Sequence, residues 1–260
     1  MKTKVFAVYN RKGGTGKTTT TLAMLSFFTD IAKKKAVAVD MDPQRSLTFL
    51  TDIHGGTTIY DVLTEGKDIR DAVTETVYGK IVTGSADLAK LESQMDEEVV
   101  SPKERIENLH ELRKVIDNLR NDYDYIIIDC PPEYENIALS CMIASDSLII
   151  PAKASKASLF ALSSLKNNIL EAKKHNPELV VEGVLLTQHN DRTNAGKYGA
   201  EGIAEMSKGL NTKIFKSKIR TSTVIEDSYF MGTSLFKMSS SLPVVNDYRE
   251  FMQELLRRKK

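Results

Sequence analysis

The most constraining feature of this 260-residue chain is a glycine-rich loop that directly follows a short apolar run. The run spans residues 5–9, and residues 10–19 read Asn-Arg-Lys-Gly-Gly-Thr-Gly-Lys-Thr-Thr. Glycines in such a loop let backbone N–H groups close around phosphate oxygens, at the positive end of the helix that follows. Lys17 is placed to pair with the β- and γ-phosphates of a nucleotide, and the Thr18 hydroxyl is placed to ligate Mg²⁺. The predicted nucleotide-binding residues are Lys12, Gly13, Gly14, Thr15, Gly16, Lys17, Thr18 and Thr19.

The loop differs from the usual phosphate-binding pattern G-x-x-x-x-G-K-[ST] at its first glycine. Arg11 takes that place, and a second lysine, Lys12, precedes the paired glycines. This arrangement resembles the deviant Walker A motif, K-G-G-x-x-K-[ST], of the ParA/MinD/NifH family of P-loop ATPases. The resemblance implies that ATP is the nucleotide and that Lys12 reaches across a dimer interface to the ATP of the other subunit. The alternative is that Lys12 is a solvated loop lysine.

Alternating strand and helix patterns predict an α/β fold, with a mainly parallel twisted sheet and helices on both faces. We expect one domain over residues 1–260, and residues 52–100 show the least regular pattern. The predicted strands are 5–9, 36–40, 125–129, 147–150, 180–186 and 213–219, and the predicted helices include 17–33, 103–120 and 245–259.

The charge is balanced overall but unevenly distributed. The formal net charge is +1, yet residues 61–135 carry 19 acidic and 9 basic residues, whereas residues 201–260 carry 7 and 11. The basic C-terminal third suggests a polyanionic partner, and ordinary solvated faces explain the counts equally well. Cys130 and Cys141 lack metal-site spacing, so we expect buried, reduced thiols. With no apolar signal region or long apolar stretch, we expect a cytoplasmic protein.

A carboxylate ends each of two apolar runs. Residues 126–128 lead into Asp129, which a parallel sheet would present at its ligand-binding carboxyl edge. The run resembles the family's Walker B motif, which implies that Asp129 holds Mg²⁺ through a water. An aspartate ending a strand otherwise often caps a turn.

The second such run continues as Asp40-Met41-Asp42-Pro43-Gln44, similar to the D-x-D-P-Q of ParA proteins. The resemblance implies that Asp42 positions the attacking water and that Asp40 supports the metal without binding it directly. Phosphoryl transfer to water needs mainly such positioning and charge; the alternative is a turn capped by both aspartates. The predicted catalytic residues are Lys12, Lys17 and Asp42, and the predicted magnesium residues are Thr18, Asp129 and Asp40.

The resemblance extends over most of the chain, and it favours one branch of the family. Residues 183–187 and 191–194 are similar to its G-V-L-L-T and R-T-N segments. D-P-Q favours ParA over MinD, and Cys130 does not look like a cluster ligand of a NifH-type reductase. The phosphate loop starts near residue 10, so we expect no N-terminal helix-turn-helix domain. Arg45 replaces a family glycine after D-P-Q, and Thr223 stands where the family usually has arginine.

Without an operator-binding domain, the ParA resemblance implies non-specific binding of double-stranded DNA through phosphate contacts. Residues 206–225 contain five basic residues and no acid. The candidate DNA-binding residues are Lys208, Lys213, Lys216, Lys218 and Arg220, of which the last three would share one face of a strand. A basic edge strand that resists aggregation is the alternative.

The C-terminal segment offers a rival function. Residues 245–256 place apolar side chains on one helical face, followed by a basic stretch at 257–260. MinD-like proteins bind membranes through such a helix, but this stripe is also what a helix packed on its own core shows. Co-sedimentation with lipid, with and without residues 245–260, separates the two readings.

The ParA resemblance implies an ATPase that forms a homodimer when ATP is bound, associates with the nucleoid, and segregates a plasmid or chromosome region. A ParB-type centromere-binding protein would stimulate hydrolysis. A metabolic P-loop enzyme such as a kinase is a third possibility, and both Lys12 and the D-P-Q segment argue against it.

Overall fold

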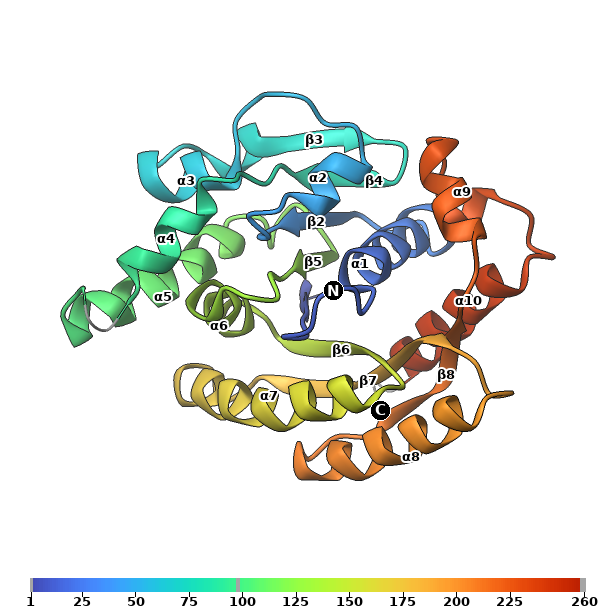
Figure 1. Cartoon of the computed structure of the whole chain (residues 1–260). Coiled ribbons are helices and arrows are strands. Elements are labelled where there is room, and N and C mark those ends of the chain that lie inside the picture. Colours follow the sequence, from blue (N-terminus) through green and yellow to red (C-terminus); the bar gives the residue numbers. More distant parts are fainter. Residues whose placement is uncertain (1, 97–98, 258–260) are drawn as a thin grey trace.

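The computed structural model describes residues 2–96 and 99–257, and these contain one eight-stranded sheet (Figure 1). The strand order is β3-β4-β2-β5-β1-β6-β7-β8, and each neighbouring pair is parallel except β3 with β4. The strands are β1 (Lys4–Val8), β2 (Ala36–Asp40), β3 (Val73–Thr76), β4 (Gly79–Val82), β5 (Tyr125–Asp129), β6 (Ser147–Lys153), β7 (Val180–His189) and β8 (Ile214–Arg220).

Helices connect the strands and cover both faces of the sheet (Figure 1). The α-helices are α1 (Lys17–Ser26), α2 (Ser46–Leu50), α3 (Ile59–Glu65), α4 (Leu88–Gln94), α5 (Pro102–Asp117), α6 (Glu135–Ala144), α7 (Lys156–His175), α8 (Asn194–Gly209), α9 (Val224–Phe230) and α10 (Pro243–Arg257). Short 3₁₀ turns are η2 (Ile69–Ala72) and η3 (Leu235–Lys237), and η1 (Phe27–Ile31) is a π-helical continuation of α1.

The hydrophobic core forms two layers, one on each face of the sheet. In β1, Val5 and Ala7 pack in the layer with α5, α6 and α7, whereas Phe6 and Val8 pack in the layer with α1 and α10. This division follows from the two-residue period of a strand, which sends successive side chains to opposite faces. Strands buried on both faces are continuous apolar runs, as the sequence showed.

The predicted fold class is confirmed, with differences at element boundaries. The helix predicted over 17–33 consists of two parts: α1, which ends at Ser26, and η1, which continues it to Ile31. The β3–β4 hairpin was not predicted, because its strands are only four residues each and β3 lacks a buried apolar run. The predicted 245–259 helix is α10, and residues 258–260 lie outside the described residues.

Helix α10 is fixed to the edge strand β8 by carboxylates as well as by apolar packing. The Glu254 side chain accepts the backbone N–H groups of Lys216 and Ser217 at 3.0 and 2.9 Å. The Asp247 side chain accepts the backbone N–H of Arg220 at 3.0 Å and also its guanidinium at 2.7 Å. The apolar face of α10 is buried in the same layer as α1. Within the described ranges, no helix is both long enough and apolar enough to cross a bilayer.

Candidate nucleotide site at the carboxyl edge of the sheet

The phosphate loop lies between β1 and α1 and adopts a glycine-dependent backbone. Gly14 and Gly16 have φ angles of 67° and 83°, a left-handed conformation that L-residues with side chains rarely adopt. Lys17 begins α1, is only 7% exposed, and its Nζ donates to the carbonyl of Lys12 at 3.4 Å. Burial lowers the pKa of Lys17, while the nearby carboxylates of Asp129 and Asp42 raise it. The loop therefore holds one ammonium group inside the turn where phosphates would bind.

The end of β7 supports this loop through two contacts that the sequence did not reveal. Thr187 Oγ1 donates to the carbonyl of Thr15 at 2.7 Å, and Gln188 Nε2 donates to the carbonyl of Gly14 at 3.3 Å. Gln188 has a left-handed φ of 48°, unusual for a residue with a side chain. The resemblance of residues 183–187 to a family segment was the only available signal, and it carried no contact information.

Lys12 lies in the loop but its side chain leaves the loop. Its backbone N–H donates to Asn10 Oδ1 at 3.0 Å, and its Nζ donates to Ser155 Oγ at 3.1 Å, at the start of α7. Among the described residues, Ser155 Oγ is the one hydrogen-bond partner of the Lys12 ammonium group, whereas Lys17 is buried.

Asp129 ends β5 directly beside the loop. Its carboxylate accepts the hydroxyls of Thr18 at 2.7 Å and Thr21 at 3.2 Å. Burial, together with the nearby Asp40 carboxylate, raises the pKa of Asp129 to about 8. Asp129 and Asp40 are register partners in neighbouring strands, so two carboxylates meet at the same edge.

Asp40 is committed to a local hydrogen-bond network. Its carboxylate accepts both the backbone N–H and the hydroxyl of Thr48, at 2.8 and 2.7 Å, and Thr48 Oγ1 in turn accepts the Gly84 N–H at 2.9 Å. A Cβ at position 84 would lie 2.8 Å from Asp40 Cγ, so the close approach requires glycine. Burial raises the pKa of Asp40 to about 6. Asp40 thus ties α2 to the end of β2.

Asp42 follows β2 by two residues and stays at the edge of the site. Its Oδ1 accepts the backbone N–H of Gln44 at 2.9 Å, so it does cap the turn before α2. Burial raises the pKa of Asp42, while the hydrogen bond from the Gln44 N–H and the ammonium of Lys17 lower it. The second carboxylate oxygen has no hydrogen-bond partner among the described residues.

The residues present fit a magnesium ion that arrives with a nucleotide. Asp42 and Asp129 are buried near Lys17, and Asp40 is buried next to Asp129, so buried carboxylates outnumber buried ammonium groups at this edge. The described residues contain no cluster of three or more carboxylate, histidine or cysteine side chains that could hold a metal alone. Mg²⁺ commonly takes one or two protein oxygens and completes its shell with water and phosphate. The Thr18 hydroxyl and Asp129 are the donors that match this requirement.

The raised pKa of Asp129 predicts a pH-dependent stability. A carboxyl whose folded pKa is about 8 keeps its proton while the unfolded chain has released it, so stability falls as pH rises from about 4 to about 8. Asparagine in its place has no such proton. We expect the nucleotide-free Asp129→Asn variant to gain on the order of 1 kcal/mol or more over the wild type at the upper end of this range. Thermal unfolding of both proteins at acidic and at mildly alkaline pH measures this, and equal pH slopes would contradict it.

The five basic residues proposed for DNA differ in their surroundings. Lys208 pairs with Glu205 and Lys218 with Asp191, each at 2.6 Å. Arg220 pairs with Asp247 at 2.7 Å. Lys213 and Lys216 form no ion pair with any described residue. They line a groove of about 510 Å³ between β8 and α10, together with Arg257 and the acidic Glu250 and Glu254.

Comparisons with known proteins agree with this geometry. Residues 3–181 match a family described as AAA domain. The sporulation initiation inhibitor protein Soj of Bacillus subtilis is 33% identical over 222 residues, which cover 83% of each chain. The chromosome partitioning protein ParA of Myxococcus xanthus is 34% identical over 207 residues, which are 77% of this chain and 70% of that protein.

A solved structure gives the same fold at lower identity. Cobyrinic acid a,c-diamide synthase of Mycobacterium smegmatis, with bound ATP analogue and magnesium, has a TM-score of 0.81 and 24% identity, covering 99% of this chain and 96% of that one. This likeness concerns the fold alone. The matched domain and the curated relatives show that the chain belongs to the AAA-domain family, and within it to the ParA-type P-loop ATPases.

Proposed function

We propose that this chain is an ATP-dependent DNA-partition protein. The observation that carries the proposal is the joint placement of Lys17, Thr18, Asp42 and Asp129 around a phosphate loop that also contains Lys12. The likeness to Soj and to a chromosome partitioning ParA supports the biological role. ATP and Mg²⁺ are the cofactors that this site accommodates.

Each residue has a role that follows from its position. Bound Mg·ATP supplies the phosphoanhydride bond and a cation that neutralises charge on the phosphates. Lys17 and the loop N–H groups would hold the β- and γ-phosphates, and Thr18 with Asp129 would hold the ion. Asp42 orients the attacking water with its free oxygen. Because the protein contributes mainly position and charge, a slow intrinsic rate suits hydrolysis that acts as a timer for a conformational switch.

Exposed aromatic side chains support a homodimer that closes over the nucleotide edge. Phe49, Phe160, Tyr198 and Phe230 are 71–91% exposed. They lie on α2, α7, α8 and α9, which follow the carboxyl ends of β2, β6, β7 and β8. Exposed apolar groups of this size commonly mark interaction surfaces. A second copy over this edge would draw Lys12 from Ser155 to the opposite ATP.

The dimer would bind DNA without sequence preference and so associate with the nucleoid, and a ParB-type partner would stimulate hydrolysis and release. Of the sequence-based candidates, Lys213 and Lys216 are the best placed to contact phosphates, because their ammonium groups have no carboxylate partner among the described residues. A membrane-binding role for α10 is less well supported, since its apolar face is buried against α1 and β8.

The test is retention on non-specific duplex DNA with ATP, with ADP or without nucleotide, over a series of salt concentrations. We expect retention with ATP alone, weakening with salt by roughly 0.9 in log–log slope for each phosphate contacted. Absence of retention in every state, with ATP bound, would contradict the partition role. Lipid co-sedimentation of the full chain would then test the MinD-like alternative.

A further inference from the structure

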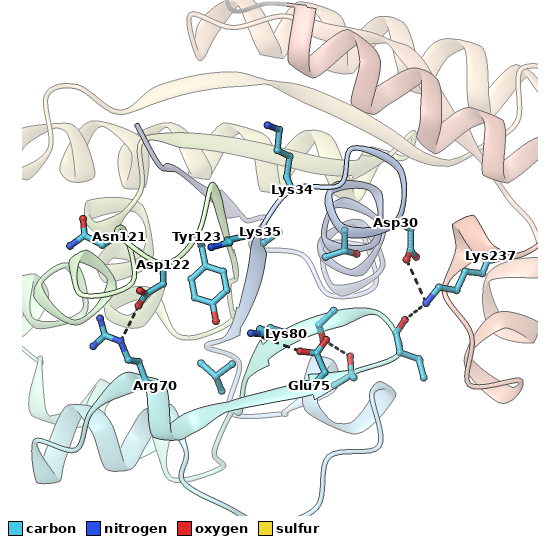
Figure 2. Close-up of a pocket in the computed structure, with 16 residues that line it drawn as sticks. Asp30, Lys34, Lys35, Arg70, Glu75, Lys80, Asn121, Asp122, Tyr123 and Lys237 are labelled. Atoms are coloured by element: carbon cyan, nitrogen blue, oxygen red, sulfur yellow. Dashed lines mark hydrogen bonds and ion pairs between the residues drawn. The ribbon is translucent and has the colours of Figure 1, made fainter. Parts of the chain in front are cut away.

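A large open cleft lies at the edge of the sheet opposite the nucleotide site. Its volume is about 840 Å³, and it is bordered by the amino ends of β2 and β4, the segment before β5 and the β3–β4 hairpin. Figure 2 shows Lys35 and Lys80 near the Tyr123 ring, and Lys34 on the adjoining turn with its side chain pointing away from them. None of the nucleotide-site residues borders this cleft.

The carboxylates of the cleft are already occupied. Asp122 accepts Arg70 Nε at 2.9 Å, and Asp30 lies 3.5 Å from Lys237 Nζ. Glu75 lies 4.0 Å from Lys80 Nζ, and Figure 2 marks all three pairs. Lys34 and Lys35, by contrast, form no ion pair with any described residue, and both are exposed. The cleft therefore has surplus positive charge at these two lysines.

The turn that carries these lysines is rigid. Lys33 has a left-handed φ of 52°, and the Lys34 N–H donates to the carbonyl of Phe28 at 2.8 Å. The Lys35 carbonyl accepts the N–H groups of Asp124 and Tyr125, at 2.8 and 3.1 Å. A fixed backbone presents both ammonium groups without ordering a loop on binding, which lowers the entropic cost of holding an anion.

The neighbouring carboxylates on this edge are also engaged. Asp124 accepts the Lys35 N–H at 3.1 Å, and Asp146 pairs with Arg120 at 3.2 Å. Glu182 accepts the Ser147 hydroxyl at 2.6 Å. Of these three acids, Asp146 and Glu182 each lie beside a cation, Glu182 at 3.8 Å from Lys4 Nζ, whereas Asp124 keeps its negative charge next to Lys35.

Lys213 directly precedes β8 and Lys216 lies in the amino half of that strand, on the same edge of the sheet. Five strand-to-strand steps separate β2 from β8, or about 24 Å at the usual strand spacing. The accumulated sheet twist over these steps is about 100°, so the two lysine pairs face different directions. They constitute two phosphate-binding places rather than one flat surface.

We infer that the cleft at Lys34 and Lys35 is a second DNA-binding site, which contacts phosphates of a duplex segment other than the one at Lys213 and Lys216. This inference rests on the proposed DNA binding. A protein partner is less suited to the cleft, because protein interfaces centre on apolar anchors and Val77 is the single exposed large apolar side chain among the described lining residues.

The position has a consequence for the dimer. Two subunits that meet through their carboxyl edges leave both amino edges facing outward. Nucleotide and DNA therefore occupy opposite edges of each subunit and do not compete. Each dimer would present four lysine pairs to DNA, enough to hold separate duplex segments together.

The experiment compares three proteins in the ATP-bound state on non-specific duplex DNA over a salt series. These are the wild type, the double variant Lys34→Ala/Lys35→Ala, and the control Lys103→Ala/Lys166→Ala, which removes two exposed lysines from the outer surfaces of α5 and α7. Thermal unfolding establishes that each variant is folded. We expect the log–log salt slope to fall by roughly 2 in the cleft variant, with no change in the control.

Several outcomes separate the possible explanations. A wild-type slope in the cleft variant overturns the inference, as does an equal loss in the control, which would show a general charge effect. Sodium tripolyphosphate serves as a second probe, and loss of its binding with an unchanged DNA slope would assign the cleft to small anions instead. If the wild type itself shows no DNA binding with ATP, the proposed function is overturned, and the inference that rests on it is overturned as well.

Discussion

Replacement of Lys17 by alanine should weaken Mg·ATP binding by at least about two orders of magnitude, or about 3 kcal/mol. Lys17 is the buried ammonium at the phosphate loop, and Asp129 and Asp42 lie close enough to affect its pKa. Without it, the phosphates would meet buried carboxylates with no protein cation between them. Isothermal titration calorimetry with Mg·ATP measures this directly, at a protein concentration where the wild type is saturated.

Lys12→Ala is the informative comparison for this variant. Because the Lys12 ammonium contacts Ser155 rather than the interior of the loop, a monomer should keep most of its ATP affinity without it. The same variant should lose ATP-dependent dimerisation. Near-wild-type ATP affinity in Lys17→Ala, or equal losses in both variants, would show that the two lysines do not have the separate roles proposed here.

Replacement of Asp42 by alanine should lower the ATP hydrolysis rate by about two orders of magnitude while ATP binding persists. Asp42 has one oxygen bonded to the Gln44 N–H and the other without a partner among the described residues, so alanine removes the group proposed to orient water. The ATP-bound dimer should therefore accumulate on DNA. Phosphate release measures the rate, and light scattering with DNA retention measures the trapped state.

Asp87→Ala controls for the loss of a carboxylate, because Asp87 lies at the start of α4 in an exposed pair with Lys90. It should hydrolyse ATP at the wild-type rate. Normal turnover in Asp42→Ala would remove Asp42 from the catalytic role. Loss of ATP binding in that variant would instead show that the aspartate acts on the turn before α2.

The sequence allowed the central part of the fold to be predicted because buried parallel strands are unbroken apolar runs. Strands β2 and β5 have the predicted boundaries, since each run ends in a carboxylate at the sheet edge. The β3–β4 hairpin was missed because no residue of Val73–Thr76 is buried and this strand pairs only at the edge of the sheet. Edge strands depend on tertiary contacts that no short window contains.

The phosphate loop could be predicted because backbone chemistry fixes the order of its residues along the chain. The contacts from β7 that hold the loop in place could not be predicted. Thr187 and Gln188 reach the loop from more than 170 positions away, as their hydrogen bonds to Thr15 and Gly14 show. The ion pair of Lys218 could not be predicted either, because its partner Asp191 is distant in sequence. The spacing of residues along the chain identifies groups that act together within one turn, whereas contacts between distant elements can be recognised only once the fold is known.

The carboxylates of α10 act as a substitute for a ninth strand. An edge strand normally offers its outer N–H groups to any extended chain, and this is how sheets join into aggregates. Glu254 and Asp247 occupy those donors on Lys216, Ser217 and Arg220. This margin of the sheet is therefore closed to sheet-to-sheet fusion. In the proposed dimer, association is left to the nucleotide edge of the sheet.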